Sequence, residues 1–342
     1  MSFRKSILTT GLTALATLGV MVGTAQARDE VRVPTLTAPF GAGIMEQIVI
    51  FERLIAKRHP WVRLVAQESP GFVYNIREMS ENKKRYKTTT FWTSTGGLWA
   101  AETGQKGFFP KPLPRDDFRW LVTRSSNCFF FATLDPNIKS IKDFSGKKIA
   151  LGRRSQTHWG LFTTKAIEDG MGVKDAKLEF LGNNAGMAAL LDGRVDVAAM
   201  GATMTADQSV VFPSGTVRKI AATGRKYYNI PIPRAATEKI NKDLKAPFVA
   251  HTLAPNKLPN QAEKLDCLGD YVFQASHKTF PDDVAHALTT VFLEIDTAAG
   301  KYLGGGKLYR RSSMCVVPVG IKAHPASLKA CRDFGVEPTI LK

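Results

Sequence analysis

Two arginines and three hydrogen-bonding side chains follow one predicted strand of the chain. They are Arg153, Arg154, Ser155, Gln156 and Thr157, and a predicted helix begins directly after them. The free backbone N–H groups and the dipole of a helix N-terminus favour an anion, and a guanidinium group adds a planar clamp for a carboxylate. The run therefore predicts a site for a small carboxylate. Alternation along the chain points only one arginine inward, and the alternative is that both are solvated.

Other strand ends carry hydroxyl and aromatic side chains. Gly201 and Thr203 follow another predicted strand, where a threonine hydroxyl bonds either to a ligand or to a helix end. The aromatic residues at strand ends of the N-terminal part are Phe40, Phe72, Phe91 and Trp92. Core packing explains each of them singly, but four together indicate a ligand with a partly apolar body.

The sequence carries none of the common catalytic or cofactor motifs. The glycines at 41–43 do not form G-x-G-x-x-G, and no G-x-S-x-G, Walker A loop or H-E-x-x-H occurs. The four cysteines form no C-x-x-C, which disfavours redox catalysis and Cys-rich zinc sites. We therefore expect a binding protein with no cofactor, no metal and no catalytic residues.

Short β-type runs alternate with amphipathic helical patterns. Strands are predicted at residues 31–36, 61–66, 88–92, 118–134, 147–152, 178–181, 195–199, 217–222 and 271–274. Helices are predicted after residue 43, at 156–169 and at 283–296. This alternation predicts an α/β fold with mostly parallel sheets, in which ligands bind at the carboxyl ends of strands. The candidate site residues lie in such strand-to-helix loops.

The N-terminus has the three parts of a secretory signal. Arg4 and Lys5 precede an apolar segment at 7–22, and a small-x-small cleavage site lies at 25–27. We expect cleavage after residue 27 and a periplasmic mature chain; the alternative is an uncleaved membrane anchor. Beyond the signal no apolar run approaches the ~20 residues of a membrane helix. Export permits disulfides, although free buried thiols are the alternative.

The chain is strongly basic and long enough for two domains. It has 342 residues, 44% of them hydrophobic, and a formal charge of +17. The basic residues are scattered, and no zinc-finger spacing, RNP-like strand or basic heptad occurs, which disfavours nucleic-acid binding. The charge indicates an anionic small molecule, although only weakly.

Three segments carry a family resemblance that covers nearly the whole mature chain. Residues 141–152, IKDFSGKKIALG, resemble the entry to the second lobe of type II periplasmic solute-binding proteins, and residues 190–198, LLDGRVDVA, resemble their "L-x-x-G-x-v-D-a-a" segment. Residues 324–329, HPASLK, with FGV at 334–336, are similar to the tail of TAXI proteins. TAXI proteins are the solute receptors of one class of tripartite ATP-independent periplasmic (TRAP) transporters.

The loops that face the ligand in TAXI proteins have diverged in this chain. The glycine-rich turns of the family are replaced by LTAPFGAG at 36–43, ESPGFVYN at 68–75 and GRRSQTH at 152–158. The glutamate-type ligand of some relatives is therefore not carried over. The resemblance places the first-lobe ligand residues at Thr37, Phe40, Ser69, Phe72, Asn75, Trp92 and Thr93.

The resemblance implies two lobes that close around the ligand by a hinge motion. Lobe I is expected at 28–125 and 272–342, and lobe II at 126–271, with two mixed, mostly parallel sheets joined by hinge crossovers. The crossovers run side by side in this fold, which favours a Cys128–Cys267 disulfide beside a local Cys315–Cys331 disulfide. If Arg153 and Arg154 are both solvated, Arg124 beside the first crossover is the next candidate clamp.

The expected function is that of a monomeric receptor that delivers an anionic solute to integral-membrane TRAP subunits. Three alternatives stay open. An ABC-type receptor for a sulfonate, phosphonate or thiamine precursor would share the fold and differ in the membrane partner. A periplasmic sensor that signals to a membrane kinase would show no transport defect on deletion. An enzyme of this fold would turn over a metabolite, and the absence of catalytic motifs disfavours it.

Overall fold

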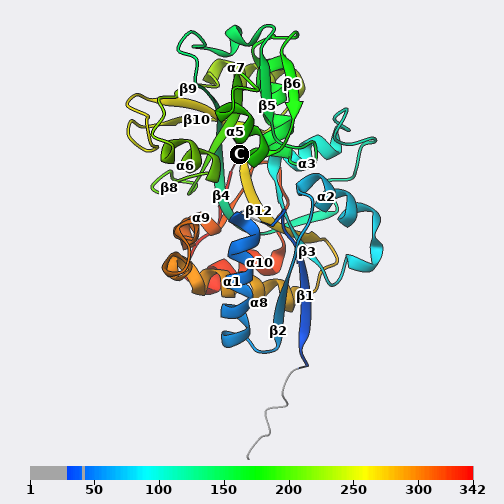
Figure 1. Cartoon of the computed structure of the whole chain (residues 1–342). Helices are drawn as coiled ribbons and strands as arrows, with labels where there is room; N and C mark the ends of the chain where they lie inside the picture. The colour runs from blue at the N-terminus through cyan, green and yellow to red at the C-terminus, as the bar shows by residue number, and fades with distance from the viewer. Residues whose placement is uncertain (1–28, 41–42, 342) are drawn as a thin grey trace, which may run out of the picture.

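The computed structural model describes residues 29–40 and 43–341 and has two lobes. The predicted signal peptide, residues 1–27, lies outside the described residues. In Figure 1 the lower lobe contains both the blue N-terminal and the orange to red C-terminal segments, and the upper lobe contains the green to yellow middle of the chain. We call the lower one lobe I and the upper one lobe II.

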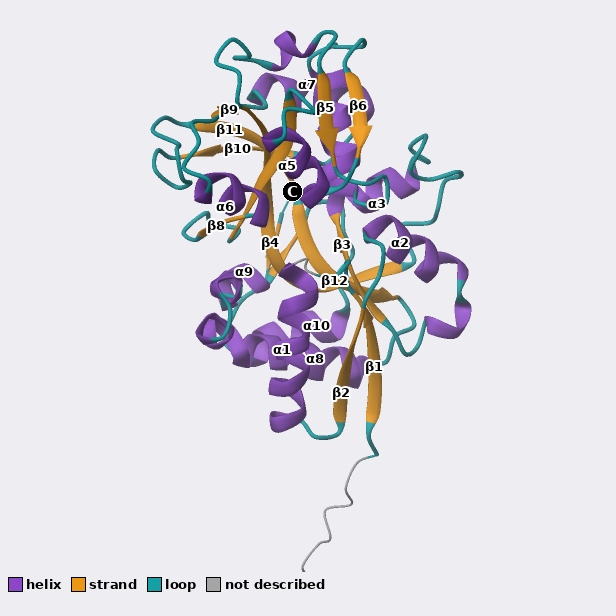
Figure 2. Cartoon of the chain, in the orientation of Figure 1, coloured by secondary structure: helices purple, strands orange, loops and turns teal. Residues whose placement is uncertain are grey.

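Lobe I is a sheet with helices packed on it (Figure 2). Its strands are β1 (Val31–Leu36), β2 (Val62–Gln67), β3 (Thr90–Ser94), β12 (Tyr271–His277) and the first part of β4 (Phe118–Thr133), with the separate short pair β13 (Val316–Val317) and β14 (Thr339–Ile340). Its helices are α1 (Gly43–Arg58), α2 (Phe72–Glu81), α3 (Thr95–Glu102), α8 (Asp282–Ile295), α9 (Arg311–Met314) and α10 (Pro325–Asp333), with the short turns η1 (Lys83–Arg85), η5 (Asp296–Lys301) and η6 (Gly304–Leu308).

Lobe II repeats this construction with shorter elements. Its strands are the second part of β4, β5 (Lys148–Leu151), β6 (Lys177–Phe180), β7 (Val197–Met204), β8 (Val211–Pro213), β9 (Tyr228–Ile230), β10 (Val249–Leu253) and β11 (Leu265–Gly269). Its helical segments are η2 (Ile141–Phe144), η3 (Thr157–Phe162), α4 (Thr163–Lys165), η4 (Ala166–Gly170), α5 (Asn183–Leu191), α6 (Gly215–Ala222) and α7 (Arg234–Leu244).

A single hydrogen-bonded network joins the strands of both lobes. Its main order is β2-β1-β3-β12-β4-β7-β5-β6. Within this network the parallel pairs join β1, β2 and β3 in lobe I and β5, β6 and β7 in lobe II, and the separate pair of β13 and β14 is also parallel. Strand β4 pairs antiparallel with β12 in lobe I and with β7 in lobe II. The predicted α/β two-lobed fold class is confirmed, but the two expected sheets are continuous through β4 and contain more antiparallel pairing than predicted.

The helices form where apolar residues recur at helical spacing. In α1, Ile48, Phe51 and Ile55 are fully buried and face the core of lobe I. The segment 217–222, predicted as a strand, is instead part of helix α6. The hydroxyl of Ser214 caps this helix by accepting from the N–H of Val217. A short apolar run of this kind fits either a strand or a helix, and the cap favours the helix. No helix in the described part of the chain combines the length and apolar character needed to cross a membrane.

Both expected disulfides are present in the structure. Cys128 on β4 is bonded to Cys267 on β11, and Cys315 is bonded to Cys331 in α10. The first bond lies in the buried cluster on one face of the lobe II sheet and ties the two crossovers together. The second closes a short loop, with a sequence separation of 16, at the C-terminal part of lobe I.

Replacing Cys315 and Cys331 together by Ala is expected to lower the free energy of unfolding by about 3 kcal/mol, the chain-entropy value for a loop of about 15 residues. Urea unfolding of the two proteins measures the difference. Peptide mapping without reduction is the direct check on both bonds. Four free thiols in the purified, exported protein would contradict the pairing.

Acid is expected to destabilise lobe II through a buried histidine. The Nε2 of His251 lies 2.7 Å from the hydroxyl of Ser126, and its Nδ1 lies 3.2 Å from the amide of Gln208. Burial lowers the pKa of His251 to about 4, against the opposing charge of Asp270. The unfolded chain therefore binds the proton more readily, so this stability is present above pH 6.5 and is lost as the pH falls towards 4.

The expected loss between pH 7 and pH 4.5 is about 2 to 3 kcal/mol. Urea unfolding at both pH values measures it, and the same measurement on His251→Gln isolates this residue. If the variant and the parent lose equal stability, His251 is not the group that titrates.

Candidate functional site

The two lobes meet first at the start of helix α2. The N–H of Val73 donates to the carbonyl of Ser155 at 3.3 Å, and the ring of Phe72 lies edge-on to that of His158, with centroids 5.3 Å apart. A Cβ on Gly71 would lie only 2.5 Å from the carbonyl oxygen of Ser155, and Gly71 has φ of +139°. Glycine is therefore required here for both conformation and close approach. The loop that begins η3 is closed onto lobe I.

A second contact between the lobes involves Arg154. Its guanidinium lies 3.8 Å from the ring centroid of Phe180 in lobe II and 5.8 Å from that of Phe108 in lobe I. The side chains of Arg153 and Arg154 are both exposed. Because an exposed guanidinium is screened by water, neither residue provides the buried carboxylate clamp predicted for one of them. The stacking instead makes Arg154 a contact that holds the lobes together.

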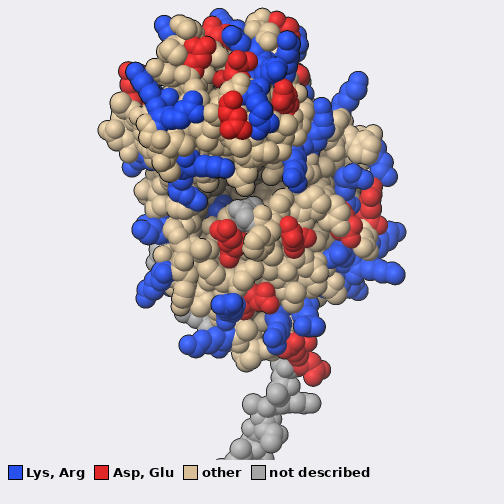
Figure 3. All heavy atoms as spheres, in the orientation of Figure 1, with Lys and Arg blue, Asp and Glu red and all other residues tan. Residues whose placement is uncertain are grey.

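The opposite edge of the interface is closed by Phe212 of β8. Its ring lies against the glycines of η6, since an added Cβ on Gly304 would be 2.8 Å from Phe212 Cε2. Between these edges Figure 3 shows a hollow between the lobes, with Lys and Arg side chains mainly above it and Asp and Glu side chains below it. The lobes therefore touch on both sides of a space that has charged side chains of both signs around it.

The floor of the interface is formed by the crossovers and contains a buried acid. Asp270 is fully buried between β11 and β12. One carboxylate oxygen accepts from the N–H of Gly96 at 3.1 Å, and the other lies 3.4 Å from the amide of Asn127. The Nε2 of His158 is 2.9 Å from this second oxygen, although without the alignment of a hydrogen bond. The pair connects the first turn of η3 in lobe II to the hinge.

Some buried polar atoms on the facing elements have no hydrogen-bond partner within the described part of the chain. They include the Oδ1 of Asn75 in α2 and the Oγ1 of Thr93 in β3 on lobe I, and the Oγ1 of Thr157 in η3 on lobe II. All three residues are at least 99% buried. Unpaired buried atoms also occur elsewhere in the lobes, for example in Thr237 of α7 and Ser313 of α9. An unsatisfied buried polar group costs about 1–3 kcal/mol, so the three atoms at the interface are candidate partners for a ligand, and all three residues were predicted as ligand residues.

Other predicted residues shape the site without facing it. The hydroxyl of Thr37 donates to the carbonyl of Gln67 at 2.7 Å, and that of Ser69 donates to the carbonyl of Thr37 at 3.1 Å. The amide of Asn75 donates to Thr37 and to Trp92. These bonds hold the loop after β1 against α2. The side chain of Gln156 accepts from the N–H of Arg153 and so fixes the turn before η3.

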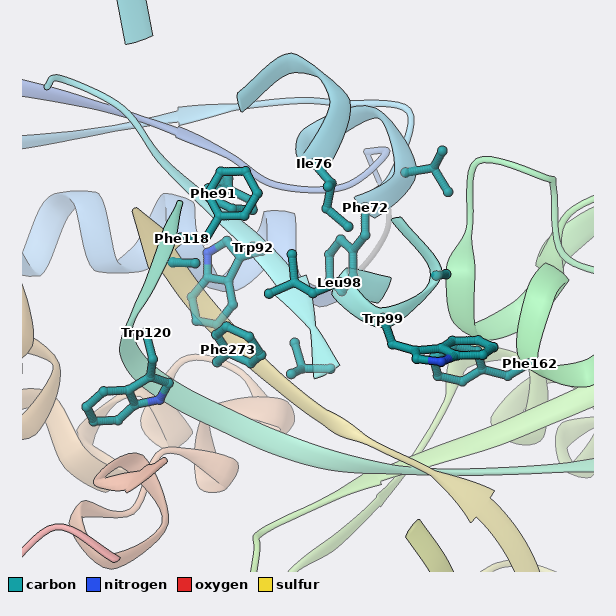
Figure 4. Packing of buried hydrophobic residues seen from close by; sticks show 14 of the residues in the cluster. Phe72, Ile76, Phe91, Trp92, Leu98, Trp99, Phe118, Trp120, Phe162 and Phe273 are labelled. Carbon is teal, nitrogen blue, oxygen red and sulfur yellow. The ribbon is translucent and has the colours of Figure 1, made fainter. Parts of the chain in front are cut away.

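Four predicted ligand contacts are corrected by the structure. Trp92 is fully buried, lies beside Phe273 in Figure 4 and packs on α8, so it belongs to the core of lobe I. Phe40 is 80% exposed and covers nothing. Gly201 and Thr203 lie within β7 rather than in a loop after it. Gly201 packs on Phe129, and the Thr203 hydroxyl donates to a backbone carbonyl at 3.4 Å.

Sequence reasoning missed His158 and Asp270 and ranked Arg124 second. His158 follows the predicted loop directly, so its position was visible, but nothing in the sequence pairs it with Asp270. Arg124 interrupts an apolar β-type run, which is a weak signal for a buried charge with a function. No group of three or more His, Cys, Asp or Glu residues within the described ranges is placed to hold a metal ion.

The fold is that of periplasmic solute-binding proteins. Three solved structures are similar to it, each with a TM-score of 0.50. The periplasmic binding protein BugD is 13% identical, with 90% of this chain and 98% of that chain covered. A protein of R. palustris solved with adipate and a structure described as a periplasmic transporter are each 12% identical, with 89% of this chain and 93% of theirs covered.

A match to a family model assigns the chain to a family. The model of the NMT1-like family matches residues 45–327, and the chain belongs to this family. The search of curated proteins found no significant match.

Replacing Thr93 or Thr157 by Val is expected to leave the free energy of unfolding of the unliganded protein unchanged or to raise it by up to about 2 kcal/mol, because an unpaired buried hydroxyl is removed. Thr35→Val is the matched control. The Thr35 hydroxyl is also fully buried but is bonded to that of Thr90 at 2.8 Å, so its loss should destabilise by about 1 kcal/mol. Thermal unfolding compares the three. Equal destabilisation by all three variants would show that the hydroxyls of Thr93 and Thr157 are satisfied within the protein.

Proposed function

We propose that the chain is an extracytoplasmic receptor that binds a small carboxylate-containing solute between its lobes and delivers it to a TRAP-type membrane transporter. The observation that carries this proposal is the set of unpaired buried oxygens of Asn75, Thr93 and Thr157 on elements that meet at the lobe interface. Buried polar groups are normally hydrogen-bonded, and a bound solute would supply partners for these three. The contacts that join the lobes would then shield the solute from water.

The carboxylate in this proposal is supported by charge and by a structural neighbour. The chain carries a formal charge of +17, and Lys and Arg side chains lie along part of the edge of the hollow in Figure 3. A strong net positive charge raises the local concentration of anions. One similar structure was solved with the dicarboxylate adipate. At 12% identity this supports adipate as a first compound to test.

The TRAP-type partner rests on the TAXI-like segments at 141–152, 190–198 and 324–336. The receptor is proposed to be a monomer in the periplasm, released from the signal peptide at residue 27. The lobes are proposed to divide after residues 125 and 271, where β4 and β12 cross the interface. A closed receptor of this kind presents both lobes together to the membrane subunits, which is how a transporter distinguishes it from the empty form.

A thermal-shift screen of mono- and dicarboxylates, amino acids and sulfonates, with adipate included, tests the receptor function. A solute at 100 times its Kd stabilises the folded protein by about 2.7 kcal/mol, which appears as a clear rise in Tm. Thr93→Val and Thr157→Val should each weaken the response to the solute that is found. If no solute raises the Tm, or if only uncharged solutes do, the proposal of a carboxylate receptor is rejected.

A further inference from the structure

Arg124 lies at an irregularity in the crossover strand. In the pairing of β4 with β12, Val272 lies opposite Ser125, and the next residue, Phe273, lies opposite Thr123. Arg124 is thus the extra residue of a β-bulge. A bulge bends the strand and re-aims one side chain, and bulges are frequent beside functional sites. Here the guanidinium is directed away from the ladder and towards α1.

The guanidinium of Arg124 is buried beside neutral groups only. The side chain is 4% exposed. Its Nε donates to the Oε1 of Gln47 at 2.7 Å and its Nη1 to the hydroxyl of Ser125 at 2.9 Å. Tyr309 donates to the same Gln47 oxygen at 3.1 Å. Within the described residues Arg124 makes no ion pair, and the nearby Glu46 is exposed. A buried charge without a counterion is expensive, so this arrangement favours the binding of an anion beside Arg124.

The free edge of Arg124 faces the start of α1. Its Nη2 lies 3.9 Å from the position that a Cβ on Gly43 would take, and Gly43 itself is exposed. The guanidinium also interacts with the hydroxyl of Tyr309, which is a neutral partner. The first-turn N–H groups of this 16-residue helix have no partners within the helix. A buried positive charge and the positive end of a helix dipole therefore lie side by side.

We propose that Arg124 and the N-terminus of α1 together bind the anionic group of the solute, with Gln47 and Tyr309 as positioning residues. This inference rests on the proposed receptor function and names the cation that recognises the ligand. The ligand class is a small acid with a carboxylate at one end.

The geometry also explains why Gln47 is a neutral residue. Its Oε1 accepts from both Arg124 and Tyr309, so it orients the guanidinium without neutralising it. A glutamate at this position would be nearly the same shape and would supply the missing negative charge from within the protein. Gln47→Glu is therefore a substitution that satisfies Arg124 and competes with the solute.

The experiment measures the Tm of the purified protein in increasing sodium acetate, with acetamide as the uncharged probe of the same shape. In the parent, acetate should raise the Tm and acetamide should not. Arg124→Met should abolish the acetate response while keeping or raising the Tm without acetate, because a buried uncompensated charge is removed. Gln47→Glu should raise the Tm without acetate and require at least tenfold more acetate for the same shift. Arg153→Met, which removes an exposed rim arginine, is the control and should respond like the parent.

The outcomes separate this inference from the receptor function. An acetate response that survives in Arg124→Met, or a parent that does not distinguish acetate from acetamide, overturns the assignment of Arg124. If a solute from the carboxylate screen binds the parent and Arg124→Met equally, the receptor function stands and the Arg124 site falls. If acetate acts through Arg124 but no solute of the screen binds, the anion site stands and the receptor function falls.

Discussion

The 16-residue strand β4 is shared by both lobes, and the rest of the structure depends on this. Its first part pairs with β12 and its second part with β7, β9 and β11. A continuous strand cannot let the lobes separate by sliding, since that would break a ladder of backbone hydrogen bonds in both lobes. The lobes can change their relative position only by bending where the strands cross, near Asn127 and Asp270.

This constraint places the two buried charges of the site on the parts that move least. Arg124 sits on β4, just before the crossing, and Asp270 sits between β11 and β12 at the crossing itself. The loops that reach across the hollow, around Val73 and Ser155, contribute neutral hydrogen-bonding groups and aromatic rings. In the proposed receptor, residues fixed on these strands would set the orientation of a bound solute, while the loops would add contacts only on closure. Recognition and closure would then belong to different elements.

The contacts between the lobes include a buried apolar part. Trp99 of α3 donates from its Nε1 to the carbonyl of Leu244 at 3.2 Å and packs on Phe248, with ring centroids 5.4 Å apart. A Cβ on Gly96 would lie 2.3 Å from the ring of Phe162. The lobes are therefore joined by packed side chains as well as by the backbone hydrogen bond from α2 to the loop before η3. A solute that bonds to both lobes would shift the balance between open and closed forms by its differential affinity for the two.

The sequence alone determined the properties that depend on local pattern. Alternating β-type and helical periods established the α/β class, because burial of one face imposes those periods. The position of strand-to-helix loops predicted Ser69, Asn75, Thr93 and Thr157 as ligand residues. All of these except Ser69 have a buried side-chain oxygen without a hydrogen-bond partner among the described residues. The even number of cysteines and the crossover topology implied by the family resemblance gave the disulfide pairs.

Only the tertiary structure decided whether a given side chain lies in a core, at the lobe interface or on the surface. Trp92 and Phe40 have similar chemistry, yet one is core and the other is exposed, because that depends on elements far away in the chain. Segment 217–222 is a helix because the hydroxyl of Ser214 caps its N-terminus, and this contact is not visible in the hydrophobic pattern. A one-residue bulge opposite Val272 and Phe273 turned Arg124 towards α1, and no sequence period encodes it. The buried charge of Arg124 became visible only when Gln47 and Tyr309, its neutral neighbours from two distant segments, were brought beside it by folding.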